Sequence, residues 1–538
     1  AENPFSGADI FQSVDAMTVQ LKHDLEIPAY HIEQTEDLPV SEILTNSISA
    51  YRMRIAAMYA RLHDNDYNGA AKHLEKAVEE DPFFAYAHYR LYRVYAALNQ
   101  RDHAERAIST ALQHKHNLPE RYQFWVKNAY YRTKEEMQQV FENAKNWVAL
   151  YPETTDGHHI LANQYENMNQ FNEAIEEHRR IFELDPEAFR ELHHIGALYK
   201  AKGEFEEALK YYGQYAEIFP KEYHSFEEIG DLYQTMGDYE GAKSNYKKAR
   251  LMEPEEISIL SRLGMIEIKL GNFRQALEQY QDALKIAKTP QDRSTVYAYL
   301  ADYSTFRGQI RKALEYYDFQ FAELEKFTPP QGLLGQKFMV MANYALIGKE
   351  DEAFRILKGL EAQQLMPPFN LFPSLGYLMV YMVLEDADKA EKAADEFESF
   401  IEITKLEVLR PILFMARGQI HEFREEYTQA IEYYEKAYEN AQPEMKKFIN
   451  LLYGESYREL KEFEKAEEYI HQTLKIEPFL PDAHYEIALV YYDMGKKEKA
   501  LEHLKKALYV WGEADPEFKP AKEAREKLAE WEPVTSKM

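Results

Sequence analysis

Residues 229–254 read IGDLYQTMGDYEGAKSNYKKARLMEP, and this stretch decides the fold. Its glycine, aromatic, alanine and proline residues stand at Gly230, Tyr233, Gly237, Tyr239, Ala242, Tyr246, Ala249 and Pro254. The same order recurs one interval earlier, at Gly196, Tyr199, Gly203, Phe205, Ala208, Tyr212 and Pro220. It recurs again one equal interval later, at Gly264, Gly271, Phe273, Ala276, Tyr280 and Ala283. A fixed period of this length indicates a repeat architecture.

The alanine of this motif marks the repeat along most of the chain. It stands at Ala70, Ala104, Ala174, Ala208, Ala242, Ala276, Ala313, Ala353, Ala390, Ala430, Ala466 and Ala500. The interval between Ala104 and Ala174 leaves room for one degenerate copy, which holds Trp125, Tyr130 and Trp147. We therefore expect thirteen copies in the 538 residues.

The residue types explain how such a copy would fold. Small residues such as Gly230 and Ala242 suit the point where two antiparallel helices cross, and the aromatic residues fill the space around that contact. One helix pair cannot bury its own apolar face, so stacking of pairs must supply the core. We expect an all-α protein with more than about 70% helix and almost no strand.

The motif resembles the tetratricopeptide repeat (TPR) over residues 51–514. This resemblance implies a right-handed superhelical solenoid of about thirteen TPR helix pairs. The Lys- and Glu-rich stretch from Pro516 to Trp531 is predicted to form a C-terminal capping helix. The predicted organisation is an N-terminal helix and linker at 1–50, a regular array at 51–290, lengthened repeats at 291–445, a regular array at 446–514, and the capping helix and tail at 515–538.

The N-terminal 50 residues do not carry the motif. Asp9-Ile10-Phe11 is expected to open an amphipathic helix that ends near Leu25. Leu38-Pro39-Val40, together with the later Asn117-Leu118-Pro119-Glu120-Arg121, resembles the join between a TolB-like domain and its TPR array in bacterial signalling proteins. The resemblance implies a soluble bacterial protein. Because the chain starts at Ala1 without Met, it fits a mature exported protein and equally a piece of a larger, cytoplasmic one.

Composition excludes several classes of function. The net charge of −28 disfavours nucleic acid, and the longest apolar stretch, Phe369 to Leu384, is too short to cross a bilayer. Without cysteine there is no thiolate metal site or Cys nucleophile. The sequence has no phosphate-binding loop, dinucleotide fingerprint or zinc-protease motif. We predict neither an enzyme nor a cofactor.

Polar residues at the repeat positions that line the concave groove in the TPR family are candidate partner contacts. They are His159, Asn163, Arg190, His193, Lys200, Glu227 and Asp231. His158, His159, His193, His194 and His224 could also hold a metal, but equivalent residues in neighbouring repeats stand about 10 Å apart, so we favour ordinary groove or packing histidines. Some family members clamp a peptide carboxylate with Asn and basic residues, and only Asn163, Arg190 and Lys200 partly match that set.

The same groove positions become apolar in the ninth to twelfth copies. The candidate contacts there are Phe338, Phe372, Leu375, Met379, Met382 and Met415. Such a stripe would suit an apolar or amphipathic helical segment, and the acidic surroundings would favour basic flanks on that segment. The alternative is that these residues are ordinary inter-helix core.

These observations favour a scaffold that holds a protein or peptide partner in its groove. The first alternative is a self-associating structural subunit of an extracellular or surface assembly, either a filament or a layer. The second is the regulatory arm of a multidomain signalling protein.

Overall fold

The computed structural model describes residues 45, 47–63, 65–362 and 372–532, together with Met17 and Gln20. Of these residues, 81% are helical and none is in a strand. The chain divides into two compact units, Ala1–Ile218 and Phe219–Met538, which we call unit 1 and unit 2. The predicted all-α fold is confirmed.

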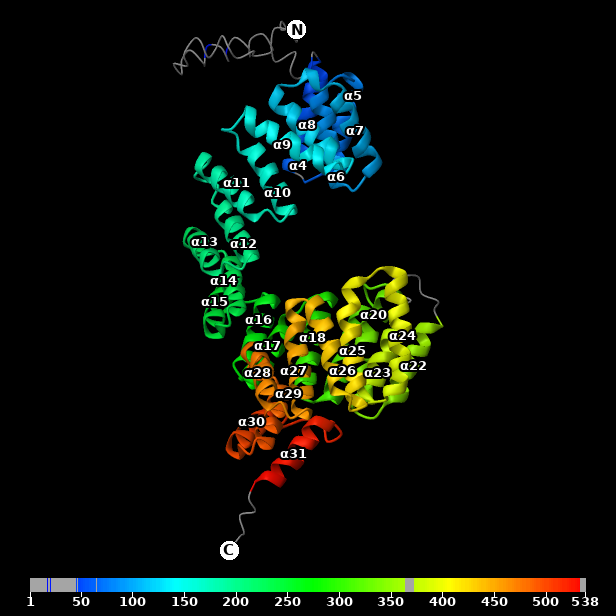
Figure 1. Cartoon of the computed structure of the whole chain (residues 1–538). Coiled ribbons are helices and arrows are strands. Elements are labelled where there is room, and N and C mark those ends of the chain that lie inside the picture. The colour runs from blue at the N-terminus through cyan, green and yellow to red at the C-terminus, as the bar shows by residue number, and fades with distance from the viewer. Residues whose placement is uncertain are drawn as a thin grey trace. The chain divides into compact units, whose positions relative to one another are not determined.

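Unit 1 consists of helices that pack on their neighbours in chain order (Figure 1). They are α4 (Ile48–Leu62), α5 (Tyr67–Glu80), α6 (Ala85–Ala97), α7 (Arg101–Gln113), a 3₁₀ turn (Lys115–Asn117), α8 (Glu120–Thr133), α9 (Met137–Leu150), α10 (Thr155–Asn167), α11 (Phe171–Leu184), α12 (Arg190–Lys202) and α13 (Phe205–Ile218). Successive pairs form antiparallel hairpins, so this unit holds five hairpins in its described part.

Unit 2 continues the same pattern. Its first helices are α14 (Tyr223–Thr235), α15 (Tyr239–Met252), α16 (Ile257–Lys269), α17 (Phe273–Ile286), α18 (Pro290–Phe306), α19 (Ile310–Leu324), α20 (Pro330–Met339), α21 (Met341–Leu346) and α22 (Glu350–Glu361). They are followed by α23 (Phe372–Val383), α24 (Ala387–Thr404), a 3₁₀ turn (Glu407–Leu409), α25 (Arg410–Phe423), α26 (Tyr427–Asn440), α27 (Pro443–Glu459), α28 (Phe463–Ile476), α29 (Pro481–Asp493), α30 (Lys497–Val510) and α31 (Lys519–Trp531). Eight hairpins precede α31 among the described residues, which brings the two units to the expected thirteen.

The small residues of the motif lie where the helices of one hairpin cross. A Cβ atom placed on Gly230 would stand 2.5 Å from Cε1 of Tyr246, and one on Gly264 would stand 2.4 Å from Cε1 of Tyr280. The motif alanines, Ala242 among them, are buried. The predicted register is therefore confirmed, because only glycine leaves room for the tyrosine ring of the second helix.

The turn between the two helices of a hairpin has a residue with positive φ. Gly237 has a φ of +80° and Gly271 one of +75°, whereas Asn99 and Lys461 hold the same place at +57° and +62°. Glycine adopts this left-handed conformation without the steric cost that a Cβ atom brings. This position explains the second glycine of the motif.

Unit 2 closes on itself. The hydroxyl of Tyr509 in α30 donates to the carbonyl of Gly271 at 3.0 Å, although the two residues are far apart in the chain. The amide of Asp515 donates to the carbonyl of Gly308 at 2.9 Å. One hydrophobic cluster joins residues of α16–α19 to residues of α27–α31. Figure 1 shows α28 and α29 beside α17 and α18. The repeats of unit 2 thus turn through enough of a circle to bring late hairpins against early ones.

The capping helix forms as predicted, but it does more than cover an end. Ala521, Ala524 and Trp531 of α31 are buried, and the ring of Trp531 stacks on Tyr492 with centroids 4.2 Å apart. Lys519 forms an ion pair with Glu385 at 2.5 Å. The helix is therefore one of the elements that join distant parts of unit 2.

Three predictions remain untested by the structure. The expected helix at residues 9–25 and the stretch Leu38-Pro39-Val40 lie outside the described residues, and the TolB-like resemblance stays a prediction. The expected domain boundaries also stay predictions. Within the described residues, none of the helices combines the length and the apolarity that crossing a membrane would require.

Candidate protein-binding surfaces

The predicted polar contacts are divided between the two units. His159, Asn163, Arg190, His193 and Lys200 belong to unit 1. Asn163 donates to the backbone carbonyl of His159 at 2.8 Å. The ring of His193 lies against Tyr212 and Tyr215, with centroids 5.3 and 5.5 Å apart. Arg190 is exposed and Lys200 is half-buried. His193 thus packs on its own hairpin.

Glu227 and Asp231 belong to α14 of unit 2. Arg262 of α16 pairs with Asp231 and approaches Glu227 at 3.5 Å. Ser258 also donates to Glu227, at 2.8 Å. The hydroxyl of Tyr246 donates to Asp231 at 2.6 Å. Glu227 and Asp231 therefore join the hairpin of α14 and α15 to α16 of the next hairpin.

The histidines predicted to cluster do not make a metal site in the described part of the chain. No group of three or more His, Asp or Glu side chains is placed to hold an ion there. His158 instead bonds to Glu177 at 2.5 Å and to the carbonyl of Pro152 at 3.1 Å.

Four of the six apolar candidates, Leu375, Met379, Met382 and Met415, line one cavity in unit 2, which we call the methionine pocket. Its volume is about 410 Å³. Its walls come from α21, α23, α25 and α27, the first helices of four successive hairpins, and are formed by Ala342, Leu375, Leu378, Met379, Met382, Val383, Ile412, Met415, Ala416, Gln419 and Met445. Leu375, Met379, Met382 and Met415 are half-buried, so their side chains remain accessible from the cavity.

Phe338 does not belong to this surface. It is 2% exposed and packs with Met341 and Leu357 in the core. The first helix of this hairpin is broken at Val340, between α20 and α21, so the regular register does not hold there. The expectation that Phe338 lines the groove is corrected accordingly. Phe372 begins α23, and its side chain lies outside the described part.

A group of acidic side chains lies on the same first helices, next to the pocket in the order of the repeats. It consists of Glu422 of α25, Glu455 of α27, and Asp482 and Glu486 of α29, and we call it the acidic cluster. Met415 and Gln419, which line the pocket, stand seven and three residues before Glu422 on α25. This spacing places the pocket residues and Glu422 on one face of the helix.

The acidic cluster holds more carboxylates than it can pair. Arg458 of α27 contacts Glu486 at 3.2 Å, and its remaining partners are Glu459 and Asp493 at 2.8 and 4.0 Å. Ser456 donates to Glu422 at 2.5 Å. Within the described residues, Arg458 is the one cation that forms an ion pair with a member of the cluster.

Burial raises the pKa values of the cluster, and neighbouring carboxylates add to this effect at Glu422 and Glu455. Burial, with Glu486 nearby, raises the pKa of Glu422 to about 7. Burial also raises the pKa of Asp482 to about 6, although its side chain touches water. Burial and the neighbouring Glu486 and Glu422 raise the pKa of Glu455 well above its usual range. A cation brought to this place would be stabilised by carboxylates that gain their charge as it arrives.

A buried charged triad in unit 1 was not anticipated from the sequence. His178 of α11 is 4% exposed, and its two ring nitrogens contact Glu191 of α12 at 2.5 Å and Glu166 of α10 at 2.8 Å. Burial alone would lower the pKa of His178, but hydrogen bonds to the two carboxylates raise it to about 9. The imidazolium therefore joins three successive helices.

We expect the stability of unit 1 to fall as the pH rises from about 6.5 to about 9. His178 binds its proton more tightly in the folded than in the unfolded chain, so its contribution is complete below pH 6.5 and is lost as the pH passes the folded pKa of about 9. The loss should be on the order of 2–3 kcal/mol. Thermal unfolding at pH 7 and pH 9.5, for the parent and for His178→Gln, measures it. A parent and variant with the same pH dependence would contradict the assignment.

Comparison with known proteins agrees with this geometry. Models described as "Tetratricopeptide repeat" match residues 61–123, 192–222, 228–293, 413–443 and 481–511. These segments match tetratricopeptide repeats. They fall in both units, on hairpins with the Gly and Ala spacing described above. No curated protein matches the chain at a significant level.

Comparison with solved structures gives matches of low sequence identity and low TM-score. Yeast Tom70 has 14% identity and a TM-score of 0.36, and the match covers 83% of this chain and 95% of Tom70. The APC/C heterotetramer Cut9–Hcn1 has 14% identity and a TM-score of 0.31, and the match covers 89% of this chain and 96% of the matched chain. MamA has 19% identity and a TM-score of 0.28, and the match covers 30% of this chain and 93% of MamA. Scores this low carry no information about function.

Proposed function

We propose that the chain is a protein-interaction scaffold and that unit 2 holds an amphipathic helical segment of its partner. The observation that carries this proposal is the methionine pocket, an apolar cavity of about 410 Å³ on the face formed by the first helices. Soluble proteins rarely leave a large apolar surface unoccupied. The flexible thioethers of Met379, Met382 and Met415 can adapt to apolar side chains of varied shape.

The neighbouring acidic cluster supports a partner of defined charge. A segment whose apolar residues enter the pocket would place its next turns over Glu422 and Glu455, because pocket and cluster follow one another on α25 and α27. A lysine or arginine on those turns would meet carboxylates in excess of their single arginine. We therefore infer that the partner segment has an apolar face followed by basic residues.

The first test uses a labelled helical model peptide with a leucine face and three lysines at one end. We expect it to bind the parent and to lose at least about tenfold in affinity for the double variant Met379→Glu, Met415→Glu, because charges would then line the apolar pocket. Met236→Glu is the matched control, since Met236 is exposed in unit 2 outside the pocket. Thermal melting of each variant separates lost binding from lost folding.

The outcomes distinguish the readings. A folded double variant that no longer binds supports the pocket. A double variant that unfolds would show that Met379 and Met415 belong to the core. Unchanged binding by a folded double variant would refute the proposal. A peptide in which glutamates replace the lysines should bind at least about tenfold more weakly, since like charges would meet at the cluster.

We also expect the affinity of the lysine peptide to rise between pH 5.5 and pH 8. The raised pKa of about 7 means that Glu422 is protonated at pH 5.5, so a lysine gains its full attraction only once the carboxyl has lost its proton. Glu422 is faced by Ser456, Tyr434, Glu455, Glu486 and Arg458. Arg458, the one cation among them, already pairs with Glu486. An increase of about tenfold is expected from proton linkage. Glu422→Gln should reduce the increase without abolishing it, because the pKa values of Asp482 and Glu455 are also raised. A leucine peptide without lysines should show no increase.

A further inference from the structure

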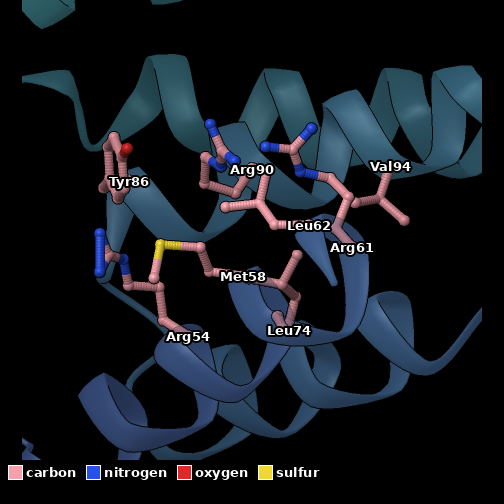
Figure 2. Close-up of a pocket in the computed structure, with 9 residues that line it drawn as sticks. Arg54, Met58, Arg61, Leu62, Leu74, Tyr86, Arg90 and Val94 are labelled. Atoms are coloured by element: carbon pink, nitrogen blue, oxygen red, sulfur yellow. The ribbon is translucent and has the colours of Figure 1, made fainter. Parts of the chain in front are cut away.

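A second cavity lies in unit 1, between the first two hairpins. Its volume is about 160 Å³. Figure 2 shows the residues around it, which come from α4, α5 and α6 and are Arg54, Ala57, Met58, Arg61, Leu62, Leu74, Tyr86, Arg90 and Val94. We call it the arginine pocket after Arg54, Arg61 and Arg90. Leu62 is 57% exposed, so the pocket reaches solvent on that side.

The three arginines bring three positive charges to this pocket. Within the described residues none of them forms an ion pair, although the chain has 92 acidic and 64 basic residues. The Nε atom of Arg61 is buried and has no hydrogen-bond partner there. Burial, with Arg93 and Arg61 nearby, lowers the pKa of Arg90. All three arginines are half-buried, and half-buried guanidinium groups that form no ion pair with the described residues favour a bound anion.

Aromatic rings hold one of the arginines in position. The guanidinium carbon of Arg54 lies 5.3 Å from the ring centroids of both Tyr51 and Tyr86. Contacts of this kind orient a guanidinium and leave its N–H groups available. In Figure 2 the guanidinium groups of Arg61 and Arg90 lie side by side at one edge of the cavity, and Met58 lies between them and Arg54.

The repeat register explains why a cavity exists here. Arg54, Arg61 and Leu74 hold the positions that Phe226, Tyr233 and Tyr246 occupy in the hairpin of α14 and α15. In that later hairpin the ring of Tyr246 packs over Gly230. In the first hairpin the three aromatic residues are absent, so space remains between α4 and α6. The pocket therefore lies mainly at packing positions between helices. Leu62 and Tyr86 stand at the repeat positions of Lys200 and Arg190, so the pocket borders the groove positions considered above.

The remaining residues around the cavity favour an apolar group on the ligand. Ala57, Met58, Leu74 and Val94 are apolar, and a cavity of about 150 Å³ lined by such residues can hold a benzene ring. The geometry points to a ligand with an aromatic or branched apolar group and one carboxylate. We propose that Arg61 and Arg90 bind that carboxylate while the apolar group fills the cavity, and that Arg54 adds positive charge to the pocket. Guanidinium groups match a carboxylate through paired N–H···O bonds.

The test titrates the full chain with sodium benzoate by isothermal calorimetry. We expect benzoate to bind and to raise the Tm of unit 1. Benzamide, which has the same shape without the charge, should bind at least about tenfold more weakly. Inorganic phosphate, which has charge but no apolar group, should also bind more weakly. Equal binding of benzoate and benzamide, or tighter binding of phosphate, would overturn the proposal.

Variants identify the residues. Arg61→Gln and Arg90→Gln should each weaken benzoate at least about tenfold, whereas the exposed Arg101→Gln of the same unit should not. Without ligand, Arg61→Gln should leave the Tm unchanged or raise it, because it removes a half-buried charge whose buried Nε atom has no hydrogen-bond partner among the described residues. A lower Tm would mean that Arg61 already has a counter-charge within the chain, which would refute an empty anion site. Unchanged benzoate affinity in both variants would refute it as well.

Two sources could supply the carboxylate, and a peptide arm separates them. A short peptide that ends in phenylalanine with a free carboxylate is compared with the same peptide amidated at its end. If the free peptide binds at least as tightly as benzoate and the amide does not, the ligand is a protein C-terminus. If only benzoate binds, the ligand is a free organic acid. If neither peptide nor benzoate binds, the pocket takes no carboxylate.

Discussion

Gly230→Leu lowers the free energy of unfolding of unit 2 by about 3 kcal/mol or more. A Cβ atom at this position would stand 2.5 Å from the ring of Tyr246, which is itself fully buried, so neither side can yield without opening the hairpin of α14 and α15. Overpacking in a dense core costs about 1–3 kcal/mol, and a whole leucine side chain exceeds the usual single methylene. Ala242→Leu, at the same crossing, should behave alike.

The matched control is Gly359→Leu. Gly359 also lies inside a helix of unit 2, but nothing stands within 4 Å of its Cβ position. Leucine there should be neutral or slightly stabilising because it has a higher helix propensity than glycine. Chemical denaturation of both variants measures the difference. If Gly230→Leu and Gly359→Leu unfold at the same denaturant concentration, the register of the repeat is wrong.

Gly271→Ala opens the closure of unit 2. Gly271 has a φ of +75°, and its Cβ position lies 2.5 Å from Cζ of Phe479, which belongs to the loop between α28 and α29. The substitution combines a left-handed backbone cost of about 1–2 kcal/mol with a steric clash. Because the contact joins segments that are far apart in the chain, the clash should release the late hairpins from α16 and α17.

Gly237→Ala is the control that separates the steric clash from the backbone cost. Gly237 has a φ of +80° in the equivalent turn, and nothing lies within 4 Å of its Cβ position. Both variants bear the backbone cost, so the difference between them reports the contact with Phe479. Hydrogen exchange should accelerate in α28–α30 of Gly271→Ala and stay near the parent rate in Gly237→Ala. Equal protection in both would show that the closure does not depend on this contact.

Most of the repeat architecture could be predicted from local pattern. Gly230 and Ala242 mark the crossing of two helices that adjoin in sequence, and the spacing to the next copy marks the next crossing. The lining of the methionine pocket could be predicted in the same way. Leu375, Met379 and Met382 hold successive groove positions of one copy, and Met415 holds a groove position of the next copy. Where the helix breaks at Val340, the pattern failed and Phe338 was misplaced.

Other features of the candidate sites could not be found in this way. His178 depends on Glu166 and Glu191 in two different helices, and no spacing rule connects these three residue types. The arginine pocket had a signal, since Arg54 and Arg61 replace the aromatic residues of later copies. That signal becomes meaningful only once α6 is seen to bring Arg90 to the same cavity.

The sequence by itself determined the helix class, the thirteen hairpins and, except at the break near Val340, the register of their small and aromatic residues. It could do so because each of these depends on contacts between neighbours in the chain. Only the tertiary structure decided that α28–α31 return to α16–α19 and that a pocket and a carboxylate cluster share one face of unit 2. Small rotations between successive hairpins add up over many repeats, and contacts between distant repeats depend on that sum. A periodic pattern therefore specifies the packing of each hairpin on the next, but it does not specify which distant hairpins come into contact.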